Sequence, residues 1–337
     1  MFKYIGNTFV VLALALIIPF FFPRSEKSVS LNTLPSAIKS WHERGSYINI
    51  FGYKTFYIHE KSKNLNKVNS TYALVHGFPT SSYDYHSVIE ELLNHGNVVV
   101  HDQVGFGFSD KPTDFTYSVL ELAEHCLELY RKLNVQGEIV LVGHDMGDSV
   151  VMEILTRHHR KMLPGFNFSF SKFVFTNGGM NYERANLRIS QSIVSSPIFG
   201  PFFNAWSVNT GLSDIIGPIQ LSGIYSPKAE ASQVKGDVES MALLYSLKGG
   251  HKMFYKLIYY LNDRINFEFR WYPALVEISK EIPVKLVWGN EDAVAPMKIA
   301  NFIKSLNYED IELNVIENCG HFSMLEAPQK WLNYVIN

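Results

Sequence analysis

The sequence predicts an α/β protein with one mostly parallel sheet that is covered by helices on both faces. Short apolar runs rich in β-branched residues alternate with segments of helical periodicity over residues 72–176, and the pattern returns from residue 284 to the C-terminus. Continuous apolar runs of this kind are typical of parallel strands, which are buried on both faces. The alternation stops over residues 180–272, where helical patches dominate. We therefore expect one sheet interrupted by a mainly helical insertion.

Composition limits the possible functions. A chain of 337 residues that is 47% apolar can bury one large core. A formal net charge of −2 gives no basic footprint, so nucleic acid is not an expected partner. The sequence contains neither a cluster of residues at metal-ligand spacing nor a phosphate-binding loop, and it therefore predicts no metal and no organic cofactor.

The N-terminus is expected to be a membrane anchor. Residues 5–22 are almost entirely apolar, and about 18 apolar residues are just enough to span a bilayer. The residues at 19–23 are bulky, whereas a signal-peptide cleavage site needs small residues. We therefore expect residues 1–24 to be retained as a single-pass anchor, with secretion after signal cleavage as the alternative. Residues 25–46 are expected to be a linker.

The folded core is expected over residues 47–179 and 273–337, with the insertion at 180–272 forming a helical cap, or lid. A β-hairpin around Gly52 opens the core. Strands are expected at 47–50, 54–59, 72–75, 98–100, 139–142, 173–176, 284–288 and 312–316, and core helices at 85–93, 118–133, 150–156 and 328–336.

One stretch has the pattern of a strand, a sharp turn and a helix. The apolar strand 139–142 leads into Gly143-His144-Asp145-Met146-Gly147, and helical periodicity resumes at Val150. Two glycines flank the tip because a strained elbow needs neighbours without side chains. The tip of such an elbow usually carries serine. Here it carries the carboxylate of Asp145.

Two further loops follow predicted strands and supply the partners of this carboxylate. In open α/β sheets, reactive groups gather at the carboxyl ends of the strands. Asp292 follows strand 284–288, and His321 follows strand 312–316. We interpret Asp145 as the nucleophile, His321 as the base that activates water, and Asp292 as the carboxylate that orients the imidazole. Glu291 is a close rival to Asp292.

The choice of a carboxylate nucleophile determines the reaction. A carboxylate needs no deprotonation, so it can attack a saturated carbon to form an alkyl ester, which water activated by His321 then hydrolyses. The backbone N–H groups of Phe78 and Met146 are expected to form the oxyanion hole. Two alternatives stay open: an acyl-ester hydrolase or acyltransferase of lipid metabolism, and a non-catalytic scaffold that binds a lipid or a protein.

At these residues the chain resembles the epoxide hydrolase and haloalkane dehalogenase branch of the α/β-hydrolase fold. The similarity lies in His76-Gly77-Phe78-Pro79, in the elbow around Asp145 and in Gly320-His321. The chain is similar also to the mesoderm-specific transcript family of animals, over residues 76–84, 105–112 and 177–179. The second resemblance implies a membrane-associated hydrolase of the endoplasmic reticulum with no settled substrate. The apolar N-terminus and the aromatic side chains of the insertion favour a small apolar or lipid-derived epoxide or ester as the substrate.

The chain also departs from that branch. Its dehalogenases typically hold the halide with an asparagine at the position of Phe78 and a tryptophan at that of Met146, so the resemblance does not favour dehalogenation. Its epoxide hydrolases open the ring with lid tyrosines. The segment Arg270-Trp271-Tyr272 resembles the one that supplies such a tyrosine, which makes Tyr272 the candidate proton donor. The second tyrosine is left open among Tyr225, Tyr245 and Tyr255.

Overall fold

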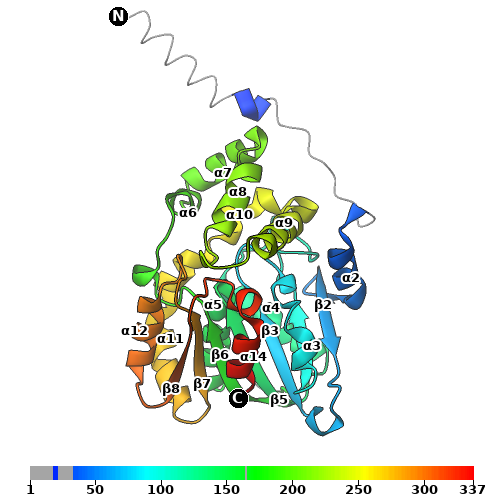
Figure 1. Cartoon of the computed structure of the whole chain (residues 1–337), viewed down its shortest axis with the longest axis vertical. Helices are drawn as coiled ribbons and strands as arrows, with labels where there is room; N and C mark the ends of the chain where they lie inside the picture. Colours follow the sequence, from blue (N-terminus) through cyan, green and yellow to red (C-terminus); the bar gives the residue numbers. More distant parts are fainter. Residues whose placement is uncertain (1–17, 22–32, 164) are drawn as a thin grey trace, which may run out of the picture.

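The computed structural model describes residues 18–21, 33–163 and 165–337 (Figure 1). The expected anchor at residues 1–24 therefore lies outside the described residues, apart from Ile18–Phe21. No helix in the described part of the chain has the length and apolarity needed to cross a membrane. The first part of the expected linker also lies outside the described residues.

The described residues form one eight-stranded sheet in the order β1-β2-β4-β3-β5-β6-β7-β8. β1 and β2 form the expected antiparallel hairpin, and β2 pairs antiparallel with β4. The six strands β3 to β8 all run parallel to their neighbours among themselves. The prediction of a mostly parallel sheet is therefore confirmed. The strands are β1 (Ser46–Ile50), β2 (Tyr53–Glu60), β3 (Ser70–Val75), β4 (Asn97–His101), β5 (Gly137–His144), β6 (Phe168–Thr176), β7 (Val284–Gly289) and β8 (Ile311–Ile316).

Helices pack on both faces of this sheet. The core helices are α2 (Ser36–Arg44), α3 (Ile89–Leu92), α4 (Val119–Lys132), α5 (Met146–His159), α12 (Met297–Leu306), α13 (Ser323–Glu326) and α14 (Pro328–Ile336), with 3₁₀ turns at η2 (Leu65–Lys67), η3 (Ser82–Tyr85) and η4 (Tyr182–Arg184). Successive side chains of a strand point to opposite faces, so each strand contributes to two cores. On β3, Ala73 and Val75 pack with α4 and α5, whereas Tyr72 and Leu74 pack with α2, α3 and α14.

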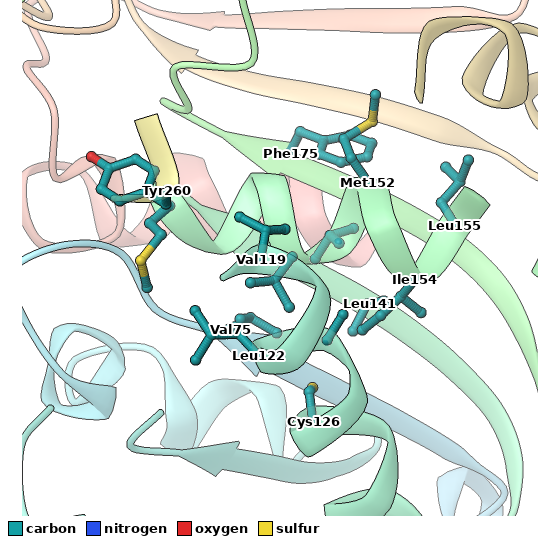
Figure 2. Close-up of a cluster of buried hydrophobic side chains, with 14 of the residues drawn as sticks. Val75, Val119, Leu122, Cys126, Leu141, Met152, Ile154, Leu155, Phe175 and Tyr260 are labelled. Atoms are coloured by element: carbon teal, nitrogen blue, oxygen red, sulfur yellow. The ribbon is translucent and has the colours of Figure 1, made fainter. Parts of the chain in front are cut away.

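Figure 2 shows part of the first core. Side chains of α4 and α5, such as Leu122 and Ile154, pack over Val75 and Leu141 of the sheet. Tyr260 joins the same cluster although it belongs to the insertion between β6 and β7. The insertion is therefore attached to the core beside the helix that follows the predicted elbow.

Between β6 and β7, where every residue is described, the chain turns through η4 and then forms a group of helices that we call the cap, residues 189–279. They are α6 (Ile189–Val194), α7 (Phe199–Thr210), α8 (Ser213–Ser222), α9 (Ala231–Ser246), η5 (Leu247–Met253), α10 (Phe254–Leu257) and α11 (Tyr260–Ser279). α11 packs along α5, and a buried carboxylate joins the two helices: Glu153 accepts hydrogen bonds from Arg270 and from Trp271 Nε1, the latter at 3.0 Å. The expected domain boundary at 272/273 is wrong as an element boundary, since α11 continues through Pro273 to Ser279.

The expected linker over residues 25–46 is wrong in its second half. Residues 36–44 form α2, which buries Ile38 and Trp41. These side chains are three positions apart and so share one helical face, a signal too short to stand out in a polar segment. Trp41 Nε1 donates a hydrogen bond to Ser82 Oγ at 3.2 Å, which ties α2 to the loop after β3.

Candidate active site

The predicted elbow is present, and its tip is strained. Asp145 separates β5 from α5 with φ 49° and ψ −108°, a backbone conformation that is costly for a residue with a side chain. A Cβ at Gly147 would lie 2.2 Å from the carbonyl oxygen of Val75, and one at Gly143 would lie 2.6 Å from Asp148 Oδ1. Only glycine fits at both positions, as the sequence indicated. The elbow is therefore wedged between β3 and its own helix.

Asp292 lies in the loop that follows β7, and both oxygens of its carboxylate accept hydrogen bonds. His321 Nδ1 lies 2.8 Å from its Oδ2, which also accepts a hydrogen bond from Asn177 Nδ2 at 2.9 Å. The N–H groups of Val294 and Ala295 donate to Oδ1 at 2.8 and 2.9 Å. Burial raises the pKa of Asp292, but the charge of His321 and these hydrogen bonds outweigh it and lower the pKa below its ordinary value. Asp292 is therefore an anion beside the imidazole.

The rival Glu291 lies elsewhere. Its side chain accepts a hydrogen bond from Ser226 Oγ, and its Oε1 lies 3.9 Å from Lys228 Nζ. The structure thus distinguishes the two adjacent acids, Asp292 and Glu291, which the sequence alone could not do.

His321 is buried, and it lines the same cavity as Asp145. Its backbone N–H donates to the carbonyl of Ile224 at 2.9 Å, which fixes the loop after β8. With Nδ1 bonded to Asp292, Nε2 of the neutral ring is the proton acceptor. Burial lowers the pKa of His321, but the charges of Asp292 and Asp145 raise it to about 9. While Asp145 and Asp292 are both charged, His321 therefore holds a proton at neutral pH.

One of the two expected oxyanion donors contacts the carboxylate of Asp145. The N–H of Phe78 donates to Asp145 Oδ2 at 3.0 Å. Met146 begins α5, and the first N–H groups of a helix have no partner within it. The segment after β3, which contains Phe78 and Ser82, is held by Asp102. The side chain of Asp102 accepts hydrogen bonds from the N–H of Ser82 at 2.8 Å and from that of Phe108 at 2.7 Å.

Arg264 is a site residue that the sequence did not reveal. It comes from α11 of the cap, is 2% exposed, and its Nη2 donates to the carbonyl of Asp145 at 2.8 Å and lies 3.5 Å from Asp145 Oδ1. Its Nε donates to Ser149 Oγ at 2.8 Å, and its guanidinium lies 4.5 Å from the ring centre of Tyr260. A permanent positive charge is thus held against the strained residue. No sequence motif marked it, because the contact spans 119 positions and depends on how α11 packs.

A cavity of about 910 Å³ separates the cap from the sheet. Asp145, His321 and Phe78 form its floor. The cap contributes mostly apolar and aromatic side chains, among them Leu221, Ile224, Leu243, Tyr245, Leu247, Phe254 and Tyr260. Burial raises the pKa of Tyr260, and the charge of Asp145 raises it further, so its hydroxyl is protonated.

The nominated lid tyrosine lies away from this cavity. Tyr272 is not among the residues that line it; its hydroxyl lies 2.9 Å from Glu268 Oε2 and 3.0 Å from the carbonyl of Met180. Of the three alternatives for the second tyrosine, Tyr245 lines the cavity, whereas Tyr225 contacts Asp237 and Tyr255 lines a separate, smaller pocket. Tyr260 lines the cavity, and the sequence did not single it out.

Two further residues near the site, His76 and Cys319, have structural surroundings. His76 accepts a hydrogen bond from the N–H of Gln103 at 3.0 Å and is completely buried, so it shapes the loop after β3. Cys319 is buried, and burial raises the pKa of its thiol. Within the described ranges, no three or more His, Cys, Asp or Glu side chains are grouped as metal ligands.

A strand-elbow-helix with an acid at its tip, a buried acid-histidine pair and a capped cavity define a hydrolase of the α/β class. The chain belongs to the alpha/beta hydrolase family, whose sequence model matches residues 73–333. It is 34% identical to the hydrolase LipZ of Mycobacterium tuberculosis over 261 residues, 77% of this chain and 85% of that one. It is 30% identical to the mesoderm-specific transcript protein of Mus musculus over 309 residues, 89% and 87% of the two chains. The crystallised epoxide hydrolase CorEH shares the fold, with a TM-score of 0.59, 20% identity and coverage of 86% and 95%.

Proposed function

We propose that this hydrolase opens an apolar epoxide in two steps through an alkyl ester on Asp145. The observation that carries the proposal is the surroundings of the Asp145 carboxylate. It stands at the tip of the elbow, accepts a hydrogen bond from Phe78 N–H, lies beside Arg264 and shares a cavity with His321. An anion held in this way is a nucleophile that needs no base.

In the first step, a carboxylate oxygen of Asp145 attacks an epoxide carbon, and the bond between that carbon and the ring oxygen breaks. The oxygen takes the hydroxyl proton of Tyr260, whose raised pKa keeps that proton in place until the alkoxide develops. Arg264 orients the carboxylate from outside the cavity, because it contacts Asp145 without being a lining residue. The products of this step are a hydroxyalkyl ester and a tyrosinate.

Esterification removes the charge of Asp145, which lowers the pKa of His321 and lets the ring release its proton to solvent. In the second step, the neutral ring takes a proton from water, and the hydroxide attacks the ester carbonyl carbon of Asp145. The N–H groups of Phe78 and Met146 stabilise the oxyanion. When the tetrahedral adduct collapses, the leaving alkoxide takes the proton of His321. The carboxylic acid returns its proton to Tyr260, so the net reaction is epoxide plus water to diol.

The cavity supports an apolar substrate, because aliphatic and aromatic side chains of the cap make up much of its wall. Its volume of about 910 Å³ is that of a site for a molecule larger than a simple epoxide, such as an epoxidised acyl chain. The expected anchor at residues 1–24 would hold the enzyme where such substrates dissolve.

The test is to trap the ester. The full chain carrying His321→Gln is incubated with a panel of aliphatic and lipid epoxides, and its mass is measured intact and after digestion. We expect one epoxide mass to be added to the peptide that contains Asp145, because the variant keeps the nucleophile and lacks the base. A matched variant, Asp145→Ala with His321→Gln, should gain no mass.

Two other outcomes would contradict the proposal. If only esters label the enzyme, and a small alcohol releases the label by transesterification, Asp145 carries an acyl group and the reaction is acyl transfer. If no compound of either class labels the folded variant or is turned over by the wild type, the fold serves as a binding scaffold.

A further inference from the structure

The cap exposes an unusual number of large apolar side chains. They come from three consecutive helices and the turn between the first two, and we call them together the apolar cap face: Ile189, Ile193, Ile198, Phe199, Phe202, Ile215 and Ile219. Ile189 is 81% exposed, and Phe199 and Phe202 are each 67% exposed. Single exposed apolar residues are ordinary, but seven on three consecutive helices and the turn between the first two indicate an interaction surface.

This part of the chain also lacks charge. Asp214 is the one charged residue between positions 189 and 227 of the sequence. α8 carries apolar side chains on two faces: Leu221 and Pro218 line the cavity beside the polar Asp214 and Gln220, whereas Ile215 and Ile219 are exposed. A helix with apolar side chains on two faces normally has apolar surroundings on both. The inner side of α8 faces the cavity, whereas the apolar side chains on its outer side are exposed.

We propose that the apolar cap face inserts into the surface of a phospholipid bilayer and that α8 separates the lipid from the cavity. A substrate dissolved in the bilayer then needs to pass only this helix to reach Asp145. The proposal concerns the outer face of the cap and holds whatever chemistry Asp145 performs, so the two proposals can fail separately.

Shape and chain order favour a bilayer over a second copy of the protein. Figure 1 draws α7 at the end of the molecule away from the sheet, so the apolar cap face covers a protruding tip. A protruding tip fits a deformable lipid surface better than a rigid, self-complementary interface. The N-terminal run at residues 5–22 is apolar, and Phe21 within it is 73% exposed. The same chain thus carries an apolar N-terminal sequence and, separately, the apolar cap face, and one membrane can accommodate both.

The chemistry of the face also predicts how it binds. Because no lysine or arginine occurs between positions 189 and 227, anionic headgroups offer it no attraction. Binding must come from burying apolar side chains at the interface, as it does for amphipathic helices. Insertion is therefore expected in purely zwitterionic phosphatidylcholine, with little dependence on salt.

The protein contains its own reporter for this contact. Of its five tryptophans, Trp41, Trp271, Trp288 and Trp331 are buried, whereas Trp206 on α7 is partly exposed. The full chain is reconstituted into vesicles of phosphatidylcholine that is brominated in the upper acyl chain, since bromine quenches only tryptophans that reach it. We expect fluorescence to fall relative to unbrominated vesicles, and Trp206→Phe to abolish that difference.

A pair of matched variants tests the face itself. Phe199→Glu with Phe202→Glu places two charges in the first turn of α7, where the helix dipole favours them, so the fold should be kept. This variant should remain with the vesicles through its N-terminal segment and lose the quenching. The control Leu65→Glu alters an 83% exposed leucine outside the cap and should be quenched like the wild type.

Two results would overturn the proposal. One is wild-type protein that floats with the vesicles while Trp206 stays unquenched. The other is a double variant that is quenched as strongly as the wild type. Should the double variant instead change a dimer into a monomer in sedimentation, with Trp206 unquenched in both proteins, the face joins two copies of the chain and the bilayer proposal is wrong.

Discussion

In most proteins charged side chains are exposed and large apolar side chains are buried. The cavity floor and the outer face of the cap both depart from this distribution, each in its own way. The floor buries charged side chains: Asp145, Asp292 and His321 are 4%, 5% and 2% exposed. The cap leaves large apolar side chains in contact with water. A buried charge persists only where the interior supplies partners, and each of these has them. The cap face has no such internal explanation, so its partner must come from outside.

The two regions therefore have separate tasks. The core and α11 hold the reacting groups, whereas α6 to α8 determine what approaches them. Substitutions on the floor should therefore change the rate, and substitutions on the cap face should change where the enzyme works.

The largest loss of activity is expected when the acid partner of His321 is changed. Asp292→Asn should lower kcat by about 10⁴-fold, because an amide holds the imidazole in the wrong tautomer and cannot stabilise its charge. Glu291→Gln is the matched control and should stay near the wild-type rate, since Glu291 contacts Ser226 and Lys228. Steady-state kinetics on the epoxide found by trapping would measure both. Equal losses in the two variants would contradict the assignment.

A smaller loss is expected at the cap residue that reaches the floor. Arg264→Gln should slow formation of the ester by roughly 10²-fold, because a small displacement of an oriented nucleophile is that costly. KM should change little, since Arg264 does not line the cavity. Single-turnover mixing separates ester formation from hydrolysis, and hydrolysis should keep its wild-type rate. A change in KM alone would place Arg264 among the binding residues.

The buried pair also makes a prediction about stability that needs no substrate. The folded protein raises the pKa of His321 to about 9 from its ordinary 6.5. Proton binding by His321 therefore stabilises the fold fully below pH 6.5, and this contribution is lost as the pH rises through 9. Relative to His321→Gln, the free energy of unfolding of the wild type should fall by about 3 kcal/mol between about pH 6 and pH 9.5.

Urea unfolding of both proteins at the two pH values measures this difference, and groups that titrate alike in the two proteins cancel. A constant difference would mean that the folded protein binds no extra proton at His321, and the description of the pair would be wrong.

The smallest effect on activity is expected for substitutions on the apolar cap face. Phe199→Glu with Phe202→Glu should leave kcat/KM unchanged for a water-soluble epoxide in the absence of vesicles, because neither residue lines the cavity. Progress curves of the variant and the wild type in buffer provide the check. A large loss in buffer would show that the cap face shapes the cavity from a distance.

The floor could be predicted from the sequence because its parts are local. Asp145, Asp292 and His321 each lie within five residues of the end of a predicted strand, and parallel strands bring their carboxyl ends to one edge. Two glycines marked the elbow, because a side chain at either position would collide with neighbouring atoms. The choice between Asp292 and Glu291 needed coordinates, since neighbouring loop residues point in unrelated directions.

The cap contribution could not be predicted, because it depends on one long helix. Tyr260 and Tyr272 both belong to α11, and twelve residues of helix separate them by about 18 Å along the axis. Only the end that carries Tyr260 and Arg264 reaches the floor. The local resemblance around Tyr272 gave no information about which end that is. α2 escaped prediction for a similar reason, since two buried side chains are too few to set a period.

The fate of water oxygen shows directly whether Asp145 is the nucleophile. Wild-type enzyme turns over an excess of epoxide in oxygen-18 water, and the peptide containing Asp145 is then weighed. Hydrolysis through an alkyl ester places solvent oxygen in the carboxylate of Asp145, so we predict a heavier peptide after repeated turnovers and an unlabelled one in His321→Gln. Full turnover with the label only in the diol would mean that water attacks the substrate directly, and Asp145 would not be the nucleophile.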